Sequence, residues 1–416
     1  MQSLSPLRKQ IARISRYHPW YSDLLEQQGI DANSAELAEL PLMTADILEK
    51  HYFTQQNRTE PGLSVYRTSG TSSGIRKAIY YSEEDDESYI ASKADCFREF
   101  LEIKTNGGAS AESRQLSVRT ALADMGTGHA AGTALTIFER LGLRAESLSF
   151  SLPIEEHMKK LESFRPELLY TMPSILEAIA RAASDPTSYG IRKIILVGEI
   201  ATPEWQANMA QRFGLTPLDL LDTYGSIEIG AIASYSHELG QYVMADGVYA
   251  EAVPAERIDP RFEPLQENES VLVLTSYVRS LFPAIRYVTY DVVRDFRTIE
   301  IDGVPRQCFT CLSKRIGADL KHGEKISIYD IESVVHQFAK DAELRVRIRD
   351  NKLSVHIRSR ALDDAMLAAI SHALEHKIED IGLMIKNRIL DGIAVTRAAD
   401  DEQLERGSVK SKKLYF

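Results

Sequence analysis

Short apolar runs alternate with helically spaced apolar positions through the middle of the chain, between residues 115 and 235. The strand-like runs are 116–123, 168–171 and 193–197. The stretches with helical spacing are 154–164, 174–183 and 203–213. Alternation of this kind predicts an α/β layer with a largely parallel sheet, in which binding sites lie in the loops after the carboxyl ends of strands.

The pattern differs on either side of this layer. Residues 1–60 favour helices and loops, whereas 248–312 contain short strand-like runs separated by Gly and Pro. After residue 312, apolar residues again show helical spacing. Between the helical stretches, two apolar runs flank an Asp-Asn pair, which is the pattern of a β-hairpin. The sequence therefore predicts an α/β protein with a large N-terminal body over residues 1–314, including a β-rich subdomain, and a small, mobile α+β C-terminal domain over 315–416.

The composition is that of a globular protein with an acidic balance of charge. The chain has 416 residues, 44% of them apolar, enough for about two or three domains with cores of their own. Lys and Arg number 49 against 60 Asp and Glu, and the net charge of −11 argues against nucleic acid as a ligand. No run approaches the ~18 consecutive apolar residues of a membrane span. Residues 4–14 lack the features of a secretory signal, and three cysteines are too few for a disulfide framework, so we expect a cytoplasmic protein.

A loop of small residues between two strand-like runs is the first candidate for chemistry. Residues 68–74 contain two glycines and five hydroxyl residues, and Lys77 follows closely. Glycine permits a tight backbone, and a nest of N–H groups can hold phosphate oxygens. The spacing is not that of a Walker loop, because three residues rather than four separate Gly70 from Gly74. A flexible surface turn is the alternative.

The acidic run 83–87 follows Ser82, which has the spacing of a capping box with Asp85. We expect these carboxylates to begin a helix rather than to form an acidic binding patch, because the helix dipole favours negative charge at an N-terminus.

Three further segments carry side chains suited to a nucleotide or its substrate. In 221–228, Tyr224 could stack on a base and Glu228 could bind a metal ion, although core packing and solvation are the alternatives. In 286–291, the final aspartate could accept both hydroxyls of a ribose. The tail 405–413 is basic, which more commonly indicates a solvated segment. Each segment is weak evidence alone.

Taken together, the order and spacing of these segments resemble the adenylate-forming superfamily of acyl-CoA synthetases, luciferases and adenylation domains. Residues 69–74 stand where that family has its Ser-Gly-Thr-Thr-Gly phosphate loop, and 224–228 match Tyr-Gly-x-x-Glu. Residues 283–291 match Pro-x-x-Arg-Tyr-x-x-x-Asp, and 407–413 are similar to the terminal Gly–Lys segment. The resemblance is closer to the phenylacetate–CoA ligase branch and covers nearly the whole chain.

The resemblance implies ATP- and Mg²⁺-dependent activation of a carboxylic acid as an acyl-AMP, with release of pyrophosphate. The acyl group would then pass to coenzyme A, or alternatively to the thiol of a carrier protein or to an amine. A nucleotide-binding protein without catalytic activity is the alternative from another class. Three apolar candidates for the acyl pocket favour an apolar or aryl acid. They are Met172, Leu221 and Ile232.

The resemblance also assigns roles to individual residues. Lys410 would bridge the carboxylate and the α-phosphate, with Lys412 as a rival because the glycine that precedes the family's lysine is missing. Glu228 and Thr71 would act with Lys410 in catalysis and bind Mg²⁺, and His129 would lie near the carboxylate or the thiol. The residues expected to hold the nucleotide are Ser69, Gly70, Thr71, Ser72, Ser73, Gly74, Lys77, Gly198, Glu199, Tyr224, Gly225, Asp291 and Arg315.

Two other patterns invite different interpretations. Cys308 and Cys311 have the spacing of half a zinc knuckle, but the sequence has no second pair, so we expect two free thiols. The glycines of 126–132 suggest a dinucleotide-binding turn, as in a dehydrogenase. A lone glycine pattern is weak evidence, and the family resemblance places this loop at the acyl pocket instead. The alternative is the N-terminus of a helix with a partly exposed His129.

Overall fold

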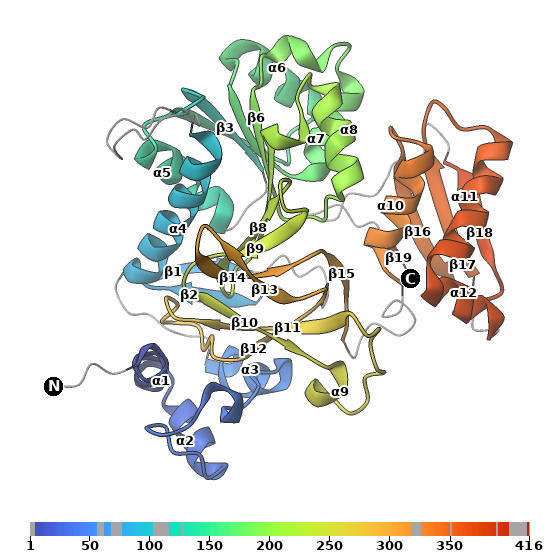
Figure 1. The fold of residues 1–416 in the computed structure, drawn as a ribbon. Helices are drawn as coiled ribbons and strands as arrows, with labels where there is room; N and C mark the ends of the chain where they lie inside the picture. Colours follow the sequence, from blue (N-terminus) through green and yellow to red (C-terminus); the bar gives the residue numbers. More distant parts are fainter. Residues whose placement is uncertain are drawn as a thin grey trace. The chain divides into compact units, whose positions relative to one another are not determined.

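The computed structural model of the chain (Figure 1) describes residues 5–55, 62–67, 77–102, 116–125, 129–317, 326–349, 352–387, 390–398 and 414–415. Backbone contacts divide the chain into two compact units. The first comprises Met1–Ala123, Thr127–Leu148 and Leu221–Cys311. The second comprises Asp124–Gly126, Ser149–Leu220 and Leu312–Phe416.

The first unit begins with the helices predicted for the N-terminal region. Ser5 caps the first of them by accepting from the amide of Arg8, and Pro6 occupies the first turn, where its missing N–H costs no hydrogen bond. The helical elements are α1 (Pro6–Tyr17), α2 (Pro19–Gln27), η1 (Leu37–Glu39), α3 (Ala45–His51) and η2 (Phe53–Gln55). A hairpin and a long helix follow, namely β1 (Ser64–Arg67), β2 (Ala78–Tyr81) and α4 (Glu83–Leu101).

The predicted capping box at the start of α4 is confirmed. The Ser82 hydroxyl accepts from the amide of Asp85 at 3.1 Å, and the Asp85 carboxylate accepts from the amide of Ser82 at 3.3 Å. After α4 come β3 (Thr120–Met125), α5 (His129–Arg140) and β4 (Arg144–Ser149). The strand expected at 116–123 begins four residues later than predicted, because Leu116 forms only an isolated bridge with Glu102.

The β-rich region of the first unit contains two groups of antiparallel strands. The sequence predicts strands for 248–312, and the first group also includes three strands between residues 220 and 244, which precede that range. One has the strand order β7-β8-β9-β14-β13. Its strands are β7 (Leu220–Ser226), β8 (Gly230–Ser236), β9 (Gln241–Met244), β13 (Arg297–Ile301) and β14 (Val304–Phe309). The other contains β10 (Val248–Val253), β11 (Glu269–Ser276) and β12 (Tyr287–Arg294), with α9 (Ala255–Ile258) between the first two.

The second unit contains the alternating strand–helix pattern of the α/β layer. Strands β5 (Leu168–Thr171) and β6 (Lys193–Val197) pair in parallel, with Leu168 opposite Lys193. The helical elements around them are α6 (Ile154–Phe164), α7 (Pro173–Ala182), η4 (Pro186–Tyr189), α8 (Pro203–Arg212) and η5 (Pro217–Asp219). The parallel pairing and all three predicted helices are confirmed.

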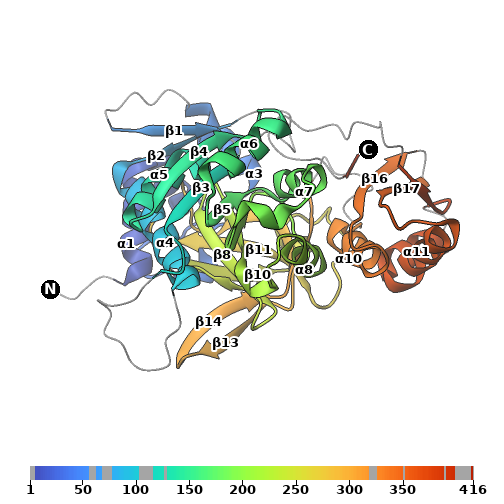
Figure 2. The same cartoon turned by 90° about the horizontal axis from the view of Figure 1, so that it is seen from above.

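The C-terminal part of the second unit is the predicted α+β fold. Strands β16 (Glu343–Arg349) and β17 (Lys352–Arg358) form the expected hairpin within the order β18-β17-β16-β19. Helices α10 and α11 cover one face of this sheet (Figure 2), and their apolar sides close a core around Ile331, Val346, Ile357 and Leu374. The remaining elements of this fold are α10 (Ile328–Phe338), α11 (Asp364–Lys377), α12 (Glu379–Lys386), β18 (Ile393–Arg397) and β19 (Leu414–Tyr415). Strand β15 (Leu312–Arg315) precedes them and is not part of this sheet.

The chain is therefore a mixed α/β protein with a large sheet-rich body and a small α+β domain at its C-terminal end. Within the described ranges, no helix combines the length and apolar character needed to cross a bilayer.

Candidate active site

The tyrosine and the aspartate expected to hold adenine and ribose lie side by side in the first unit. Tyr224, near the end of β7, donates a hydrogen bond from its hydroxyl to Oδ2 of Asp291 on β12 at 2.6 Å. Phe309 meets the Tyr224 ring edge-on at 6.3 Å between centroids and stacks on Tyr242 at 5.1 Å. The Tyr224 ring thus has a packed support on one side, which suits a platform for a base.

The turn after Tyr224 depends on two glycines. The pairing of β7 with β8 shifts register between Tyr224 and Gly225, and Gly230 has a φ of +98°. A Cβ added to Gly225 would lie 2.6 Å from the backbone oxygen of Gly230. Glycine is therefore required at position 225 to let the two strands approach where the candidate site begins.

We expect Gly225→Ala to lower the free energy of unfolding by about 1–3 kcal/mol, because a methyl group cannot enter a packed backbone contact without shifting it. Nucleotide affinity should fall as well, since Tyr224 adjoins the strained position. Melting temperature and ATP titration check both effects. Gly317→Ala is the folding control, because an added Cβ there meets no atom within 4 Å. Equal melting temperatures for the two variants would contradict the expectation.

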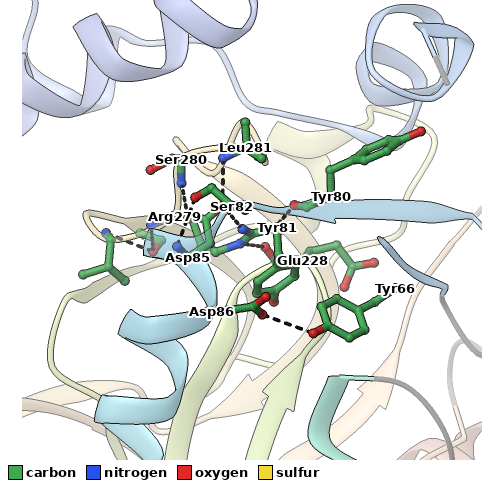
Figure 3. A network of polar contacts seen from close by, with 12 residues as sticks. Tyr66, Tyr80, Tyr81, Ser82, Asp85, Asp86, Glu228, Arg279, Ser280 and Leu281 are labelled. Atoms are coloured by element: carbon green, nitrogen blue, oxygen red, sulfur yellow. Dashed lines mark hydrogen bonds and ion pairs between the residues drawn. The ribbon is translucent and has the colours of Figure 1, made fainter. Parts of the chain in front are cut away.

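Glu228, the expected magnesium ligand, sits in the same turn and is held through its backbone. Its carbonyl oxygen accepts from Nε of Arg279 at 3.0 Å (Figure 3). The same guanidinium forms an ion pair with Asp85, donates to the carbonyl of Tyr80 at 3.1 Å and lies 3.6 Å from the Tyr81 ring centroid. Arg279 is 2% exposed. Sequence reasoning missed this arginine, which no motif marks.

Asp85 is the other centre of this network. Besides capping α4, its carboxylate accepts from the amides of Ser280 at 2.6 Å and Leu281 at 3.1 Å (Figure 3). It therefore fixes Arg279 through both the side chain and the following backbone. Figure 3 places the Glu228 side chain beside Tyr81. Burial raises the pKa of Tyr81 above its ordinary range, against the opposing charge of Arg279, and Asp85 and Glu228 add smaller contributions to the rise.

The Glu228 carboxylate suits Mg²⁺ bound together with phosphates and water, rather than a metal site in which every ligand is a protein side chain. Among the residues that the structure describes, no group of three or more His, Cys, Asp or Glu side chains could hold a metal ion. Mg²⁺ at phosphate-transfer sites is commonly held by one or two carboxylates together with the phosphates and water. A single partly buried carboxylate such as Glu228 fits that requirement.

His129, expected near the reacting groups, begins α5 and packs into a cluster of tyrosines. Its ring centroid lies 4.4, 4.1 and 4.0 Å from those of Tyr66, Tyr81 and Tyr89. Nε2 is 2.9 Å from Oδ1 of Asp86, which also accepts from the Tyr66 hydroxyl at 3.3 Å. Tyr81 contacts both His129 and Arg279, so the two clusters are continuous.

The charge state of this pair follows from its surroundings. Burial lowers the pKa of His129, against the opposing effect of Asp86. Burial would raise the pKa of Asp86, but hydrogen bonds from His129 and Ser64 outweigh it and hold that pKa below its ordinary value. At neutral pH the arrangement is therefore a neutral imidazole that donates from Nε2 to a carboxylate.

Lys77 is placed beside an acidic side chain rather than alone. Its Nζ lies 2.7 Å from Oε2 of Glu49 and 4.5 Å from the ring centroid of Phe53. The neighbouring candidate loop 68–74 lies outside the described residues, as do 126–128, Lys410 and Lys412.

Other predicted site residues lie in different surroundings. Gly198 has a φ of +86°, and the Glu199 carboxylate accepts from the amide and hydroxyl of Ser174 at 2.8 and 3.0 Å, at the start of α7. Met172 immediately precedes α7, and Arg315 is exposed at the end of β15. In the first unit, Leu221 and Ile232 are buried on β7 and β8. Their roles toward the base and the acid stay predictions.

The cysteine pair is buried and unbridged. Neither Cys308 nor Cys311 is joined in a disulfide, and the Cys308 sulfur lies 3.7 Å from the carbonyl oxygen of Arg306. Burial raises the pKa of Cys308, so the thiol form is favoured.

Comparison with known proteins adds sequence relatives and a shared fold. Residues 321–401 match the family model described as the C-terminal domain of fumarate–diaminopropanoate ligase. A fumarate–(S)-2,3-diaminopropanoate ligase from Enterobacter agglomerans is 33% identical over 408 residues, which cover 97% of both chains. A phenylacetate–coenzyme A ligase from Aromatoleum evansii is 25% identical over 294 residues, 66% of this chain and 62% of the relative.

The fold agrees with these relatives. A crystal structure of 2-hydroxyisobutyryl-CoA ligase in complex with 2-HIB-AMP superposes with a TM-score of 0.72 at 15% identity, covering 99% of this chain and 88% of the other. The predicted fold class and the resemblance to adenylate-forming enzymes are both confirmed. The chain therefore belongs to the adenylate-forming ligases, in the family of fumarate–(S)-2,3-diaminopropanoate ligase.

Proposed function

We propose that this protein uses ATP and Mg²⁺ to activate a carboxylic acid as an acyl-AMP and then transfers the acyl group to an amine. The observation that carries the proposal is 33% identity, across 97% of both chains, to a ligase named for joining fumarate to (S)-2,3-diaminopropanoate. The hydrogen-bonded pair of Tyr224 and Asp291 supports the nucleotide half of the proposal.

The chemistry proceeds in two displacements. A carboxylate oxygen attacks the α-phosphorus of ATP, the bond to the β-phosphate oxygen breaks, and pyrophosphate leaves. The amine nitrogen then attacks the acyl carbon, the bond to the phosphate oxygen breaks with its electron pair, and AMP leaves while the nitrogen loses a proton. Tyr224 would support the base and Asp291 would hold the ribose. Glu228 and Thr71 would hold Mg²⁺, which neutralises phosphate charge, and Lys410 would offset the repulsion between carboxylate and phosphate.

The acid we favour is a short dicarboxylate, because the relative of 33% identity is named for fumarate. An apolar or aryl acid is the alternative that Met172, Leu221 and Ile232 suggested. Residues 1–314 would bind ATP and the acid, and 315–416 would act as a mobile C-terminal lid. Coenzyme A is the second candidate acceptor, favoured by the phenylacetate–coenzyme A ligase that matches 66% of the chain.

A two-dimensional substrate screen tests the proposal. The acids are fumarate, succinate and phenylacetate, and the acceptors are (S)-2,3-diaminopropanoate, other amino acids and coenzyme A. We expect acid-dependent pyrophosphate release that an amino acid stimulates, and an amide product detected by mass spectrometry. A thioester with no amide would assign coenzyme A as the acceptor instead. Absence of ATP–pyrophosphate exchange with every acid would favour the non-catalytic alternative.

A further inference from the structure

Strand β12 departs from regular pairing just where it presents Asp291. Val271 of β11 pairs with Val292, and Val273 pairs with Val288, so a single residue of β11 faces three residues of β12. The Thr289 hydroxyl closes this bulge by donating to the carbonyl of Leu272 at 2.7 Å and accepting from the amide of Asp291 at 3.0 Å. Bulges of this kind re-aim a side chain away from the regular strand direction.

The residue at the apex of the bulge has an unfavourable backbone conformation. Tyr290 has a φ of +63°, in the left-handed region that glycine adopts freely and a bulky side chain does not. A tyrosine at this position must therefore be held by its surroundings. Phe262 meets its ring edge-on, with centroids 6.4 Å apart.

The Tyr290 hydroxyl has a specific partner. It accepts a hydrogen bond at 3.0 Å from the amide of Ala45, the first residue of α3. Amides in the first turn of a helix have no partner inside the helix, so the hydroxyl satisfies a group that would otherwise need water. The backbone of Met43 also bonds to the start of β12, accepting from the amide of Val288 at 3.2 Å and donating to the carbonyl of Arg286, the residue before the strand, at 2.8 Å.

Helix α3 carries this connection to a second part of the site. Glu49, one turn further along α3, forms the ion pair with Lys77, the cation that follows the 68–74 loop. One end of the helix is thus tied to the residue beside Asp291, and the other end to a lysine expected to face phosphate.

We infer that Tyr290 is a positioning residue of the nucleotide site: its left-handed backbone turns the Asp291 carboxylate toward Tyr224, and its hydroxyl fixes that turn to α3. The inference rests on the proposed function, because it takes Asp291 as the ribose-binding group. It predicts that Tyr290 acts on ATP binding and on ribose recognition in particular, while the binding of the acid is unaffected.

The test compares Tyr290→Phe, which removes only the hydroxyl, with Tyr290→Gly, which permits the left-handed turn but removes both the hydroxyl and the ring that hold it. For Tyr290→Phe we expect the KM for ATP to rise about 5- to 10-fold, the order expected for one lost hydrogen bond, with kcat and the KM for the acid within about twofold of wild type. The wild type should prefer ATP over 2′-deoxy-ATP and 3′-deoxy-ATP, and Tyr290→Gly should lose most of that preference.

Tyr249→Phe is the matched control, because Tyr249 is 44% exposed on β10 and should behave as wild type. If the wild type discriminates against the deoxy nucleotides and Tyr290→Gly does so equally, the inference is overturned while the proposed function stands. If Tyr290→Phe raises the KM values of ATP and acid alike, Tyr290 has only a general structural role and the inference is wrong. If the wild type does not discriminate at all, the ribose assignment of Asp291 fails, and the inference fails with it.

Discussion

Replacing Lys410 by alanine should slow acyl-AMP formation by about 10²–10³-fold, the effect of removing one donor that stabilises developing charge. The attack of a carboxylate on a phosphate brings two anions together, and a lysine between them lowers the repulsion as the new bond forms. The second displacement, from acyl-AMP to the acceptor, separates AMP from the acyl carbon and has no such encounter. We therefore expect Lys410→Ala to leave acyl transfer from supplied acyl-AMP largely intact.

Lys412→Ala is the matched control for this prediction. It removes the same charge two residues further along the same basic tail. ATP–pyrophosphate exchange measures the first displacement for both variants, and product formation from synthetic acyl-AMP measures the second. A larger loss of exchange in Lys412→Ala would mean that Lys412 is the adenylation lysine. If neither variant loses ATP–pyrophosphate exchange, the adenylation lysine lies elsewhere in the chain.

The parts of the fold that the sequence predicted well are those with an unbroken local pattern. The apolar run that became β6 and the alternating runs of the hairpin β16–β17 are short, strongly patterned and bounded by turn residues. The first strand of the layer was placed too early, because apolar residues such as Leu116 continue before the strand without joining its ladder. Apolar character favours burial of a side chain, but it does not show whether the backbone pairs, and Leu116 itself is only half-buried.

The candidate site shows a sharper division. Tyr224 and Asp291 were found from motifs, yet their hydrogen bond joins positions 67 residues apart and depends on packing that no local pattern encodes. Asp86 belongs to an acidic run that was interpreted only through the helix dipole, but it is the partner of His129. In the sequence, Tyr290 looks like an ordinary strand residue. Its positive φ cannot be predicted from the sequence, because only a glycine would have indicated it.

Arg279 was missed for a related reason. It stands in a segment without glycine motifs or periodicity, and its partner Asp85 already had a sufficient explanation as a helix cap. The side chains of Arg279 and Asp85 are 2% and 0% exposed, which identifies the pair as a structural centre only once the fold is known. The charge of Arg279 is buried by residues that are distant in the sequence, and such burial cannot be predicted from a single sequence.

Arg279→Met should lower the free energy of unfolding of the first unit by about 3–5 kcal/mol, because it leaves the Asp85 carboxylate buried without its counter-charge. The change also removes the hydrogen bonds to the carbonyls of Tyr80 and Glu228, so the turn that carries the expected magnesium ligand should loosen. Arg279→Lys should be intermediate, since it keeps the charge but cannot reach all three partners. The double change Arg279→Met with Asp85→Ala should be less damaging than the sum of the single changes, because neither charge is then left alone.

Tryptophan fluorescence during urea unfolding measures the change in the free energy of unfolding of the first unit. The chain has two tryptophans, and in a Trp205→Phe background the remaining one, Trp20, is 7% exposed within the unit that holds Arg279. The control is Arg98→Met in the same unit, which breaks a pair whose side chains are 39% and 76% exposed and should change the unfolding midpoint little. If Arg279→Met unfolds at the same urea concentration as Arg98→Met, the buried pair does not stabilise the unit. The backbone of Glu228 would then have to be held by other contacts in the β7–β8 turn rather than by Arg279.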